Sequence, residues 1–258
     1  MEKMLKEKLE QIIGPFHSIT LLDEQGWTSE VRRIATREKS YLLKSSYIAR
    51  YRLWLKSEAE VLEKLKQNQE IPIPEYFSFF EEEGRSHLLM SFENGMSLTK
   101  ALKLAKSECE KIALIKSFGV FLQQFHEKEP LQLLKHEGDW LENQLMLAQD
   151  SFEKGHADEN ASLELLNNLK RHKPKTVQQT MIHGDCTTDN VLVINGEVRL
   201  FIDVAGMTVG DPRYDEALAI RKISGNPEYL AAFYHGYKRY KVTKNEIQYF
   251  DAGLYEFF

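Results

Sequence analysis

Three polar residues in the last third of the chain have the types and the spacing needed for chemistry on phosphates. Asp185 is followed five residues later by Asn190, and Asp203 comes directly after a β-rich run. Carboxylate and amide oxygens are the ligands that magnesium prefers, and a carboxylate can also accept the proton of a hydroxyl group. Gathered at one place, these residues would supply a base and two magnesium ligands, as magnesium-assisted phosphoryl transfer requires.

The stretch that carries these residues predicts a loop, a β-hairpin and a second loop. Val191 to Ile194 and Val198 to Ile202 are rich in β-branched residues, and Asn195-Gly196 between them is a strong turn signal. A hairpin at this place would return Asp203 to the side of Asn190. The three residues can form one site only if the hairpin brings Asp203 back to Asn190 in this way.

The loop at 183–190 has the spacing of a kinase catalytic loop. In that pattern a His precedes the Asp by two residues, the Asp accepts the substrate's hydroxyl proton, and the Asn five residues later holds magnesium. His183, Asp185 and Asn190 match it. An alternative is a metal-dependent hydrolase that uses His183 and Asp185, but the sequence offers no second histidine cluster near enough to complete such a site.

A lysine and a glutamate upstream have the types needed to hold phosphates. Lys44 ends a predicted strand, and Glu58 lies beside the apolar stripe of a strong helix predicted over 52–67. A carboxylate next to a buried face needs a cationic partner, and we expect Lys44 to be that partner, as in the kinase pair that holds the α- and β-phosphates. The alternatives are a solvated lysine and a glutamate paired with Arg52 or Lys56.

Two further segments in the N-terminal part are candidates for nucleotide contacts. The turn between the first two predicted strands holds Gly26, Thr28 and Ser29 and suits a cover for phosphates, although an ordinary hairpin turn would look the same. The connector after the last strand of this region leaves unpaired backbone groups that could bond a nucleotide base. It consists of Ser91, Phe92 and Glu93.

The secondary-structure pattern changes near Asn94-Gly95. Before that point we predict a helix at 3–13 and, over 16–92, about five antiparallel strands with one helix. After it the pattern is helical as far as the loop at 183–190. We therefore predict two domains, a nucleotide-binding lobe at 1–93 and a catalytic and substrate-binding lobe at 94–258.

The second lobe carries several predicted helices and a run of acidic residues. Two helices within 137–170 contain Glu137, Asp139, Glu142, Asp150, Glu153, Asp158, Glu159 and Glu164. They form either a solvated charged hairpin or a wall that attracts a cationic substrate. We also expect Asp211 or Glu216 to lie near the site and to favour a cationic acceptor. The other predicted helices are 99–107, 108–126, one from Pro212, 227–240 and 243–257. We expect His126 to be structural and Asp215 to brace the loop at 183–190.

Composition excludes several function classes. The net charge of -5 shows no excess of basic residues of the kind that binds nucleic acid. Only two cysteines occur, Cys109 and Cys186, so neither a disulfide framework nor a zinc spacing is present, and a reducing cytoplasm fits best. The sequence predicts no signal peptide and no membrane span. The oligomeric state cannot be inferred from these features.

With these residues in hand, the chain resembles the aminoglycoside phosphotransferase and choline kinase family of small-molecule kinases. The matching segments are YLLKS with Lys44, SEAEVLEKL with Glu58, LLMSFENG, FLQQFH, HGDCTTDN, FID and GDPRYDEA, in that order. The resemblance implies a bilobal α+β fold like that of protein kinases, ATP or GTP with Mg²⁺ as cofactors, and a helical insert at about 127–175 that helps to bind substrate.

The resemblance also implies a role for each candidate residue. Asp185 is similar to the catalytic base, Asn190 and Asp203 to the magnesium ligands, and Lys44 and Glu58 to the phosphate-binding pair. We therefore expect a phosphotransferase that uses ATP or GTP and acts on a hydroxyl of a small molecule, such as a cationic amino alcohol or an aminoglycoside. The alternative is a catalytically silent nucleotide-binding regulatory module of the same fold.

Overall fold

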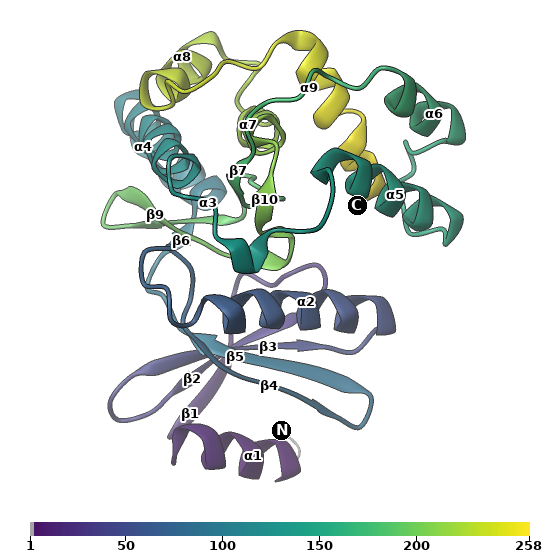
Figure 1. The fold of residues 1–258 in the computed structure, drawn as a ribbon. Coiled ribbons are helices and arrows are strands. Elements are labelled where there is room, and N and C mark those ends of the chain that lie inside the picture. The colour runs from purple at the N-terminus through teal and green to yellow at the C-terminus, as the bar shows by residue number, and fades with distance from the viewer. Residues whose placement is uncertain (1–2) are drawn as a thin grey trace. The chain divides into compact units, whose positions relative to one another are not determined.

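The computed structural model describes residues 3–258, and its contacts divide the chain into two compact units (Figure 1). The first unit comprises the residues up to Asn94 together with Leu200–Gly206, and the second comprises Gly95–Arg199 and Met207–Phe258. The predicted boundary places 200–206 in the second lobe, whereas in the structure this segment packs with the N-terminal residues. The prediction of two functional domains stays a prediction.

The first unit is built on an antiparallel five-stranded sheet. The strands are β1 (Ser18–Leu21), β2 (Glu30–Ala35), β3 (Ser40–Ser46), β4 (Tyr76–Glu82) and β5 (Arg85–Ser91), in the order β1-β2-β3-β5-β4. These five strands and helix α2 agree with the prediction of about five antiparallel strands with one helix over 16–92. Short turns join consecutive neighbours, and α2 (Ala49–Leu65) connects β3 to β4.

Two helices cover the faces of this sheet (Figure 1). Helix α1 (Lys3–Ile13) places Leu5 and Leu9 in a core with Ile34 and Leu43 of the sheet. Helix α2 packs on the other face and buries its apolar stripe, with Leu55 and other stripe residues at most 8% exposed. The stripe at helical spacing therefore predicted the buried face correctly.

The second unit is mostly helical. Its helices are α3 (Leu98–Leu104), α4 (Glu108–His126), α5 (Trp140–Glu153), α6 (Leu163–Arg171), α7 (Pro212–Ile220), α8 (Pro227–Gly236) and α9 (Lys244–Phe250), with 3₁₀ turns η1 (Gln132–Leu134) and η3 (Leu254–Phe257). A further 3₁₀ turn, η2 (Val204–Gly206), belongs to the first unit. The strands are β6 (Met96–Ser97), β7 (Thr180–Ile182), β8 (Val191–Ile194), β9 (Glu197–Phe201) and β10 (Thr208–Gly210), where β6-β8-β9 form one sheet and β10-β7 another.

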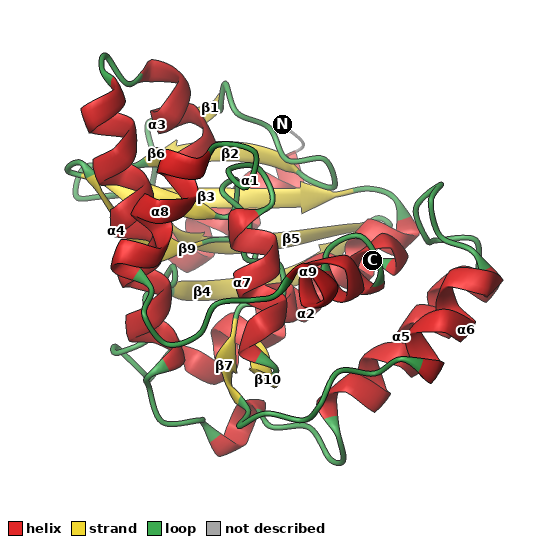
Figure 2. Ribbon diagram, turned by 90° about the horizontal axis from the view of Figure 1, so that it is seen from above, coloured by secondary structure: helices red, strands yellow, loops and turns green. Residues whose placement is uncertain are grey.

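Helices α4 and α8 lie side by side and approach closely at two glycines (Figure 2). A Cβ atom on Gly119 would lie 2.2 Å from the Phe233 carbonyl oxygen, and one on Gly236 would lie 2.2 Å from that of Lys116. Only glycine permits this backbone contact. Phe118 and Phe233 meet edge to face at the same crossing, with ring centroids 5.8 Å apart.

Two predictions about the second unit were wrong in detail. The helix predicted over 243–257 ends at Phe250, and η3 follows, because the chain turns at Gly253, where a Cβ would lie 2.4 Å from the Tyr249 carbonyl oxygen. Strands β7 and β10 were not predicted. Each has three residues, and their antiparallel pairing joins segments that are distant in sequence, so no local alternation marks them.

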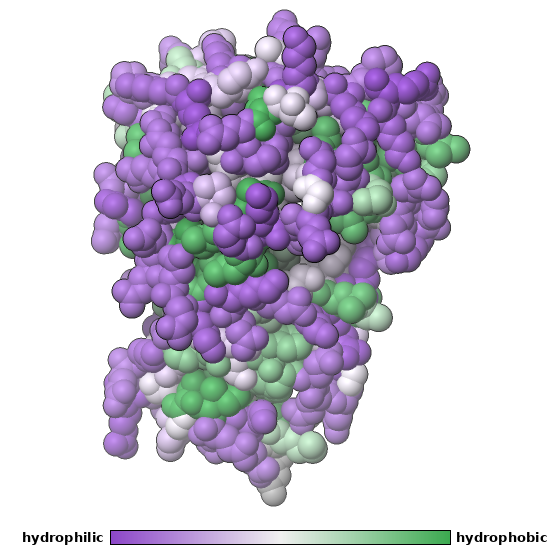
Figure 3. Space-filling view, viewed as in Figure 1, coloured by the Kyte–Doolittle hydropathy of each residue, from purple (hydrophilic) through white to green (hydrophobic). Residues whose placement is uncertain are grey.

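The surface is largely hydrophilic in the view of Figure 3, with scattered apolar side chains. No helix within residues 3–258 is both long enough and apolar enough to cross a membrane.

Candidate active site

The loop between β7 and β8 holds Asp185 and Asn190 against each other. The Asn190 side-chain amide donates to the Asp185 carboxylate, with 2.7 Å between Nδ2 and Oδ2, and to the Asp185 carbonyl oxygen at 2.9 Å. The backbone N–H of Thr187 also donates to the Asp185 carbonyl. Because the nitrogen of Asn190 faces two acceptors, its Oδ1 is the atom suited to a magnesium ion.

Asp215 braces this loop from α7. Its fully buried carboxylate accepts hydrogen bonds from the backbone N–H groups of His183, at 2.6 Å, and Gly184, at 2.9 Å. His126 lies 3.3 Å from the same carboxylate and 2.9 Å from the hydroxyl of Tyr237. The predicted bracing role of Asp215 and the structural role of His126 are both seen here.

Tyr255 of η3 also contacts Asp185. Its hydroxyl donates to Oδ1 of Asp185 at 2.9 Å. Sequence reasoning missed this residue, because a tyrosine in an apolar C-terminal segment has no pattern that distinguishes it from a core residue.

Lys44, Glu58 and Asp203 meet within the first unit. The Lys44 ammonium lies 2.8 Å from both Glu58 oxygens and also forms an ion pair with Asp203. Burial by itself lowers the pKa of Lys44, but the charges of Asp203 and Glu58 outweigh it and hold the pKa above its ordinary value. Lys44 therefore stays charged, and the Lys44–Glu58 pair has the predicted geometry.

Asp203 has an unusual backbone and an accessible carboxylate. Its φ of 56° lies in the left-handed region, which is uncommon outside glycine and frequent at functional sites. Its side chain is 49% exposed although it pairs with buried Lys44. The position of this carboxylate, exposed and next to Lys44, suits a magnesium ligand. Magnesium is usually held by one or two carboxylates together with substrate phosphates.

The turn after β1 is a closed loop rather than a simple hairpin turn. The Gln25 side chain spans it by donating to the carbonyls of Leu22 and Val31 and accepting from the N–H of Val31. At its end, the Ser46 hydroxyl lies 2.7 Å from that of Ser29 and donates to the Thr28 carbonyl. Gly26, Thr28 and Ser29 therefore belong to one loop tied to β3, and their nucleotide role stays a prediction.

The connector after β5 is partly occupied by local contacts. The Ser91 N–H donates to the Glu75 carbonyl, and the Ser91 hydroxyl donates to the Glu93 carboxylate. The Arg33 guanidinium lies 4.5 Å from the ring centroid of Phe92. That Ser91, Phe92 and Glu93 contact a nucleotide base stays a prediction.

The structure thus brings the predicted residues together in two groups. Lys44, Glu58 and Asp203 meet in the first unit, and Asp185 and Asn190 meet in the second. That Asp203 lies beside Asn190 stays a prediction. Within residues 3–258 no three His, Cys, Asp or Glu side chains form a metal cluster.

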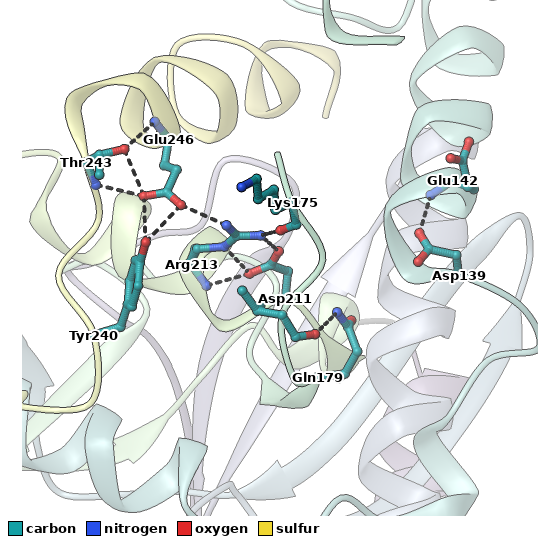
Figure 4. Close-up of polar contacts among 10 residues, drawn as sticks. Asp139, Glu142, Lys175, Gln179, Asp211, Arg213, Tyr240, Thr243 and Glu246 are labelled. Atoms are coloured by element: carbon teal, nitrogen blue, oxygen red, sulfur yellow. Dashed lines mark hydrogen bonds and ion pairs between the residues drawn. The ribbon is translucent and has the colours of Figure 1, made fainter. Parts of the chain in front are cut away.

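Asp211 and Glu216 do not offer acidic groups to a substrate, contrary to the expectation from sequence. Asp211 is 3% exposed and accepts from Nε and Nη2 of Arg213, at 3.0 and 2.6 Å (Figure 4). Arg213 also donates to Glu246 at 2.7 Å and to the Lys175 carbonyl at 2.8 Å. These contacts join the first turns of α7 and α9 to the loop before β7, around residue 175.

Glu216 is fully buried and carries a pH-dependent stability term. Its Oε1 accepts from the Tyr234 hydroxyl and the Val242 N–H, whereas Oε2 has no partner within the described residues. Burial raises its pKa to about 7, against these two hydrogen bonds. The folded chain therefore binds one proton more than the unfolded chain between about pH 4.5 and 7, so stability falls as pH rises through this window.

We expect Glu216→Gln to remove this term. Between pH 5.5 and pH 8 the free energy of unfolding of the parent should fall by about 2 kcal/mol more than that of the variant. Urea denaturation of both proteins at the two pH values measures the difference. Equal losses in the two proteins would contradict a raised pKa at Glu216.

Comparisons with known proteins find relatives of this chain among phosphotransferases. A family model described as phosphotransferase enzyme family matches residues 20–248. An aminoglycoside 3'-phosphotransferase of Streptomyces fradiae is 32% identical over 37% of the chain, and one of Enterococcus faecalis is 29% identical over 64%. These alignments cover 38% and 65% of the two relatives, so the chain spans less than two thirds of their length.

Solved structures show the same fold. A crystal structure of an aminoglycoside-3'-phosphotransferase of type VIII aligns over all of both chains, with a TM-score of 0.77 and 20% identity. A structure of the GDP and kanamycin complex of APH(2")-IIia aligns over 96% of this chain and 86% of its own, with a TM-score of 0.64 and 13% identity. A complex with ADP and hygromycin B covers 92% and 82%, with a TM-score of 0.64 and 17% identity. The predicted α+β fold is confirmed, and the chain belongs to the phosphotransferase enzyme family.

Proposed function

We propose that this protein transfers the γ-phosphoryl group of ATP to a hydroxyl of a small molecule. The observation that carries the proposal is the Asp185–Asn190 pair, in which the amide nitrogen holds the carboxylate and leaves the amide oxygen for a metal. The Lys44–Glu58–Asp203 group supports it, because it combines a permanently charged lysine with an accessible carboxylate. Family membership supports the reaction class.

Each residue has one role in this reaction. Asp185 accepts the proton of the acceptor hydroxyl and orients its oxygen toward the phosphorus. Lys44, fixed by Glu58, donates to phosphate oxygens of the nucleotide and offsets their charge. Asn190 and Asp203 would hold Mg²⁺, which neutralises phosphate charge when bound. Most of the rate enhancement then comes from positioning and electrostatics.

The acceptor that we propose is a cationic amino sugar or amino alcohol. The eight acidic residues predicted to form a charged surface all lie exposed on α5, α6 and their flanking loops. Some are already paired, such as Glu142 with Lys173 and Asp150 with Lys154. The aminoglycoside 3'-phosphotransferases that this chain resembles support the same acceptor class.

A coupled nucleotide-consumption assay tests the proposal. Purified protein is given Mg-ATP or Mg-GTP with a panel of aminoglycosides, amino alcohols and neutral sugars, and product mass confirms the transfer. We expect phosphorylation of at least one amine-bearing acceptor and none of its deoxy analogue. Tight Mg-ATP binding without transfer to any member of the panel would instead favour the silent regulatory module.

Replacing Lys44 by methionine tests the phosphate-binding role. We expect kcat/KM for the nucleotide to fall about 100-fold, because the charge that meets the phosphates is lost. Lys39→Met, in the exposed turn before the same strand, should leave kcat/KM unchanged. A Lys44 variant that folds, as judged by circular dichroism, and retains full kcat/KM would refute the role.

A further inference from the structure

The last turn of the chain places a hydroxyl on the proposed base. Tyr255 donates to Oδ1 of Asp185 at 2.9 Å, while Asn190 donates to Oδ2 at 2.7 Å. Both carboxylate oxygens therefore carry a donor in this structure. An acceptor hydroxyl that is to lose its proton to Asp185 has to share one of these oxygens or displace a donor from it.

The turn that carries Tyr255 is firmly anchored. Its neighbours Leu254 and Phe257 are fully buried, and the Phe257 ring meets that of Phe152 on α5. The Glu256 carbonyl accepts from the N–H of Asp158 at 2.9 Å, and its carboxylate accepts from Asn160 at 3.0 Å. The turn that carries Tyr255 is thus held in place by the core and by the loop between α5 and α6.

The ring of Tyr255 is also fixed in orientation. The Arg221 guanidinium lies over it, 5.0 Å from the ring centroid, and Arg221 Nε lies 3.1 Å from Oδ1 of Asp251. Burial, together with the charge of Asp185, raises the pKa of Tyr255 above its ordinary value. The phenol therefore remains a donor and cannot itself act as a second base.

We propose that Tyr255 is a positioning residue, whose hydroxyl fixes the Asp185 carboxylate and sets the side from which an acceptor hydroxyl reaches it. The inference rests on the proposed function, since it gives Asp185 the role of base. Asn190 is bound to Asp185 twice, at Oδ2 and at the carbonyl oxygen, whereas Tyr255 donates only to Oδ1. The acceptor hydroxyl therefore enters beside Tyr255 and shares Oδ1 with it. Acceptor choice then depends on how a substrate fits against the phenol.

The kinetic test uses Tyr255→Phe, which retains the ring and its packing against Arg221. We expect kcat to fall about tenfold, because the carboxylate loses a charge-assisted hydrogen bond that orients it. KM for the nucleotide should stay within about twofold, since Tyr255 acts on the acceptor side. Tyr229→Phe is the matched control, because the hydroxyl of half-buried Tyr229 donates to Glu108 and not to Asp185, so this substitution should change neither constant.

Fluorine NMR provides a readout that needs no turnover. A 3-fluorotyrosine is placed at position 255 through a reassigned stop codon, and its resonance is compared with that in Asp185→Asn at one pH. We expect the resonance to shift when the carboxylate charge is removed, and expect no shift from Asp189→Asn. The inference is overturned if the resonance has the same chemical shift in the parent and in Asp185→Asn, or if Tyr255→Phe retains full kcat. A resonance that responds to Asp185 in a protein without any transferase activity would support the contact and refute only the proposed function.

Discussion

Replacing Asp185 by asparagine is expected to lower kcat for phosphoryl transfer by about 10³-fold, with KM for the nucleotide nearly unchanged. A positioned general base contributes about 10²- to 10⁴-fold to such reactions. The asparagine retains the shape of the side chain and one oxygen that accepts from Asn190 or from Tyr255, and the hydrogen bond from Asn190 to the carbonyl oxygen of residue 185 is unaffected, so the loop should keep its structure. Single-turnover measurement of product formation separates the chemical step from release of product.

Asp189→Asn in the same loop is the matched control. Asp189 pairs with Lys222 at the surface and is about half exposed, so its substitution should leave kcat within about twofold. Turnover that persists at the parental rate in the Asp185 variant would show that another group accepts the proton. Loss of activity in both variants would indicate instead that the loop is sensitive to any change of charge.

Replacing Arg213 by alanine is expected to lower the free energy of unfolding by about 3 to 5 kcal/mol. Removing one partner of a buried ion pair leaves the other charges uncompensated. Here the guanidinium, only 4% exposed, is bonded to both Asp211 and Glu246 (Figure 4). Denaturant titration of the variant and its parent measures the difference.

The surface pair of Arg199 with Glu197 supplies the comparison for this prediction. Both side chains are more than half exposed, and Arg199→Ala should cost less than about 1 kcal/mol. Equal, small effects of the two substitutions would mean that the Arg213 network adds little to stability. A double variant, Arg213→Met with Asp211→Asn, should recover part of the loss because it removes a buried charge together with its partner.

Much of the site could be predicted because its residues carry local signals. Glu58 lies beside the apolar stripe of α2, where a carboxylate requires a cationic partner. This requirement predicted the ion pair with Lys44, which the structure contains. The start of α9 also carries a local signal, because Thr243 and Glu246 have the spacing of a capping box and form one. The Asp185 to Asn190 spacing predicted two groups that the structure places in contact.

Other features depend on contacts between distant segments and left no local trace. The hydrogen bond from Tyr255 to Asp185 joins residues 70 positions apart. The burial of Asp211 and Glu216 follows from the packing of α7 against α9, so their acidic side chains looked available to a substrate when they are not. Such cases require knowledge of tertiary packing, which overrides the preference of charged residues for the surface.

The indole of Trp27 turns the loop after β1 into an optical reporter. It is 99% exposed, whereas Trp54 is 40% exposed and Trp140 is 5% exposed. Because these are the three tryptophans of the chain, a water-soluble quencher should reach Trp27 first and leave the emission of Trp140 almost intact. The fraction of fluorescence that the quencher removes, measured with and without nucleotide, therefore reports whether this loop changes its surroundings when the site is filled.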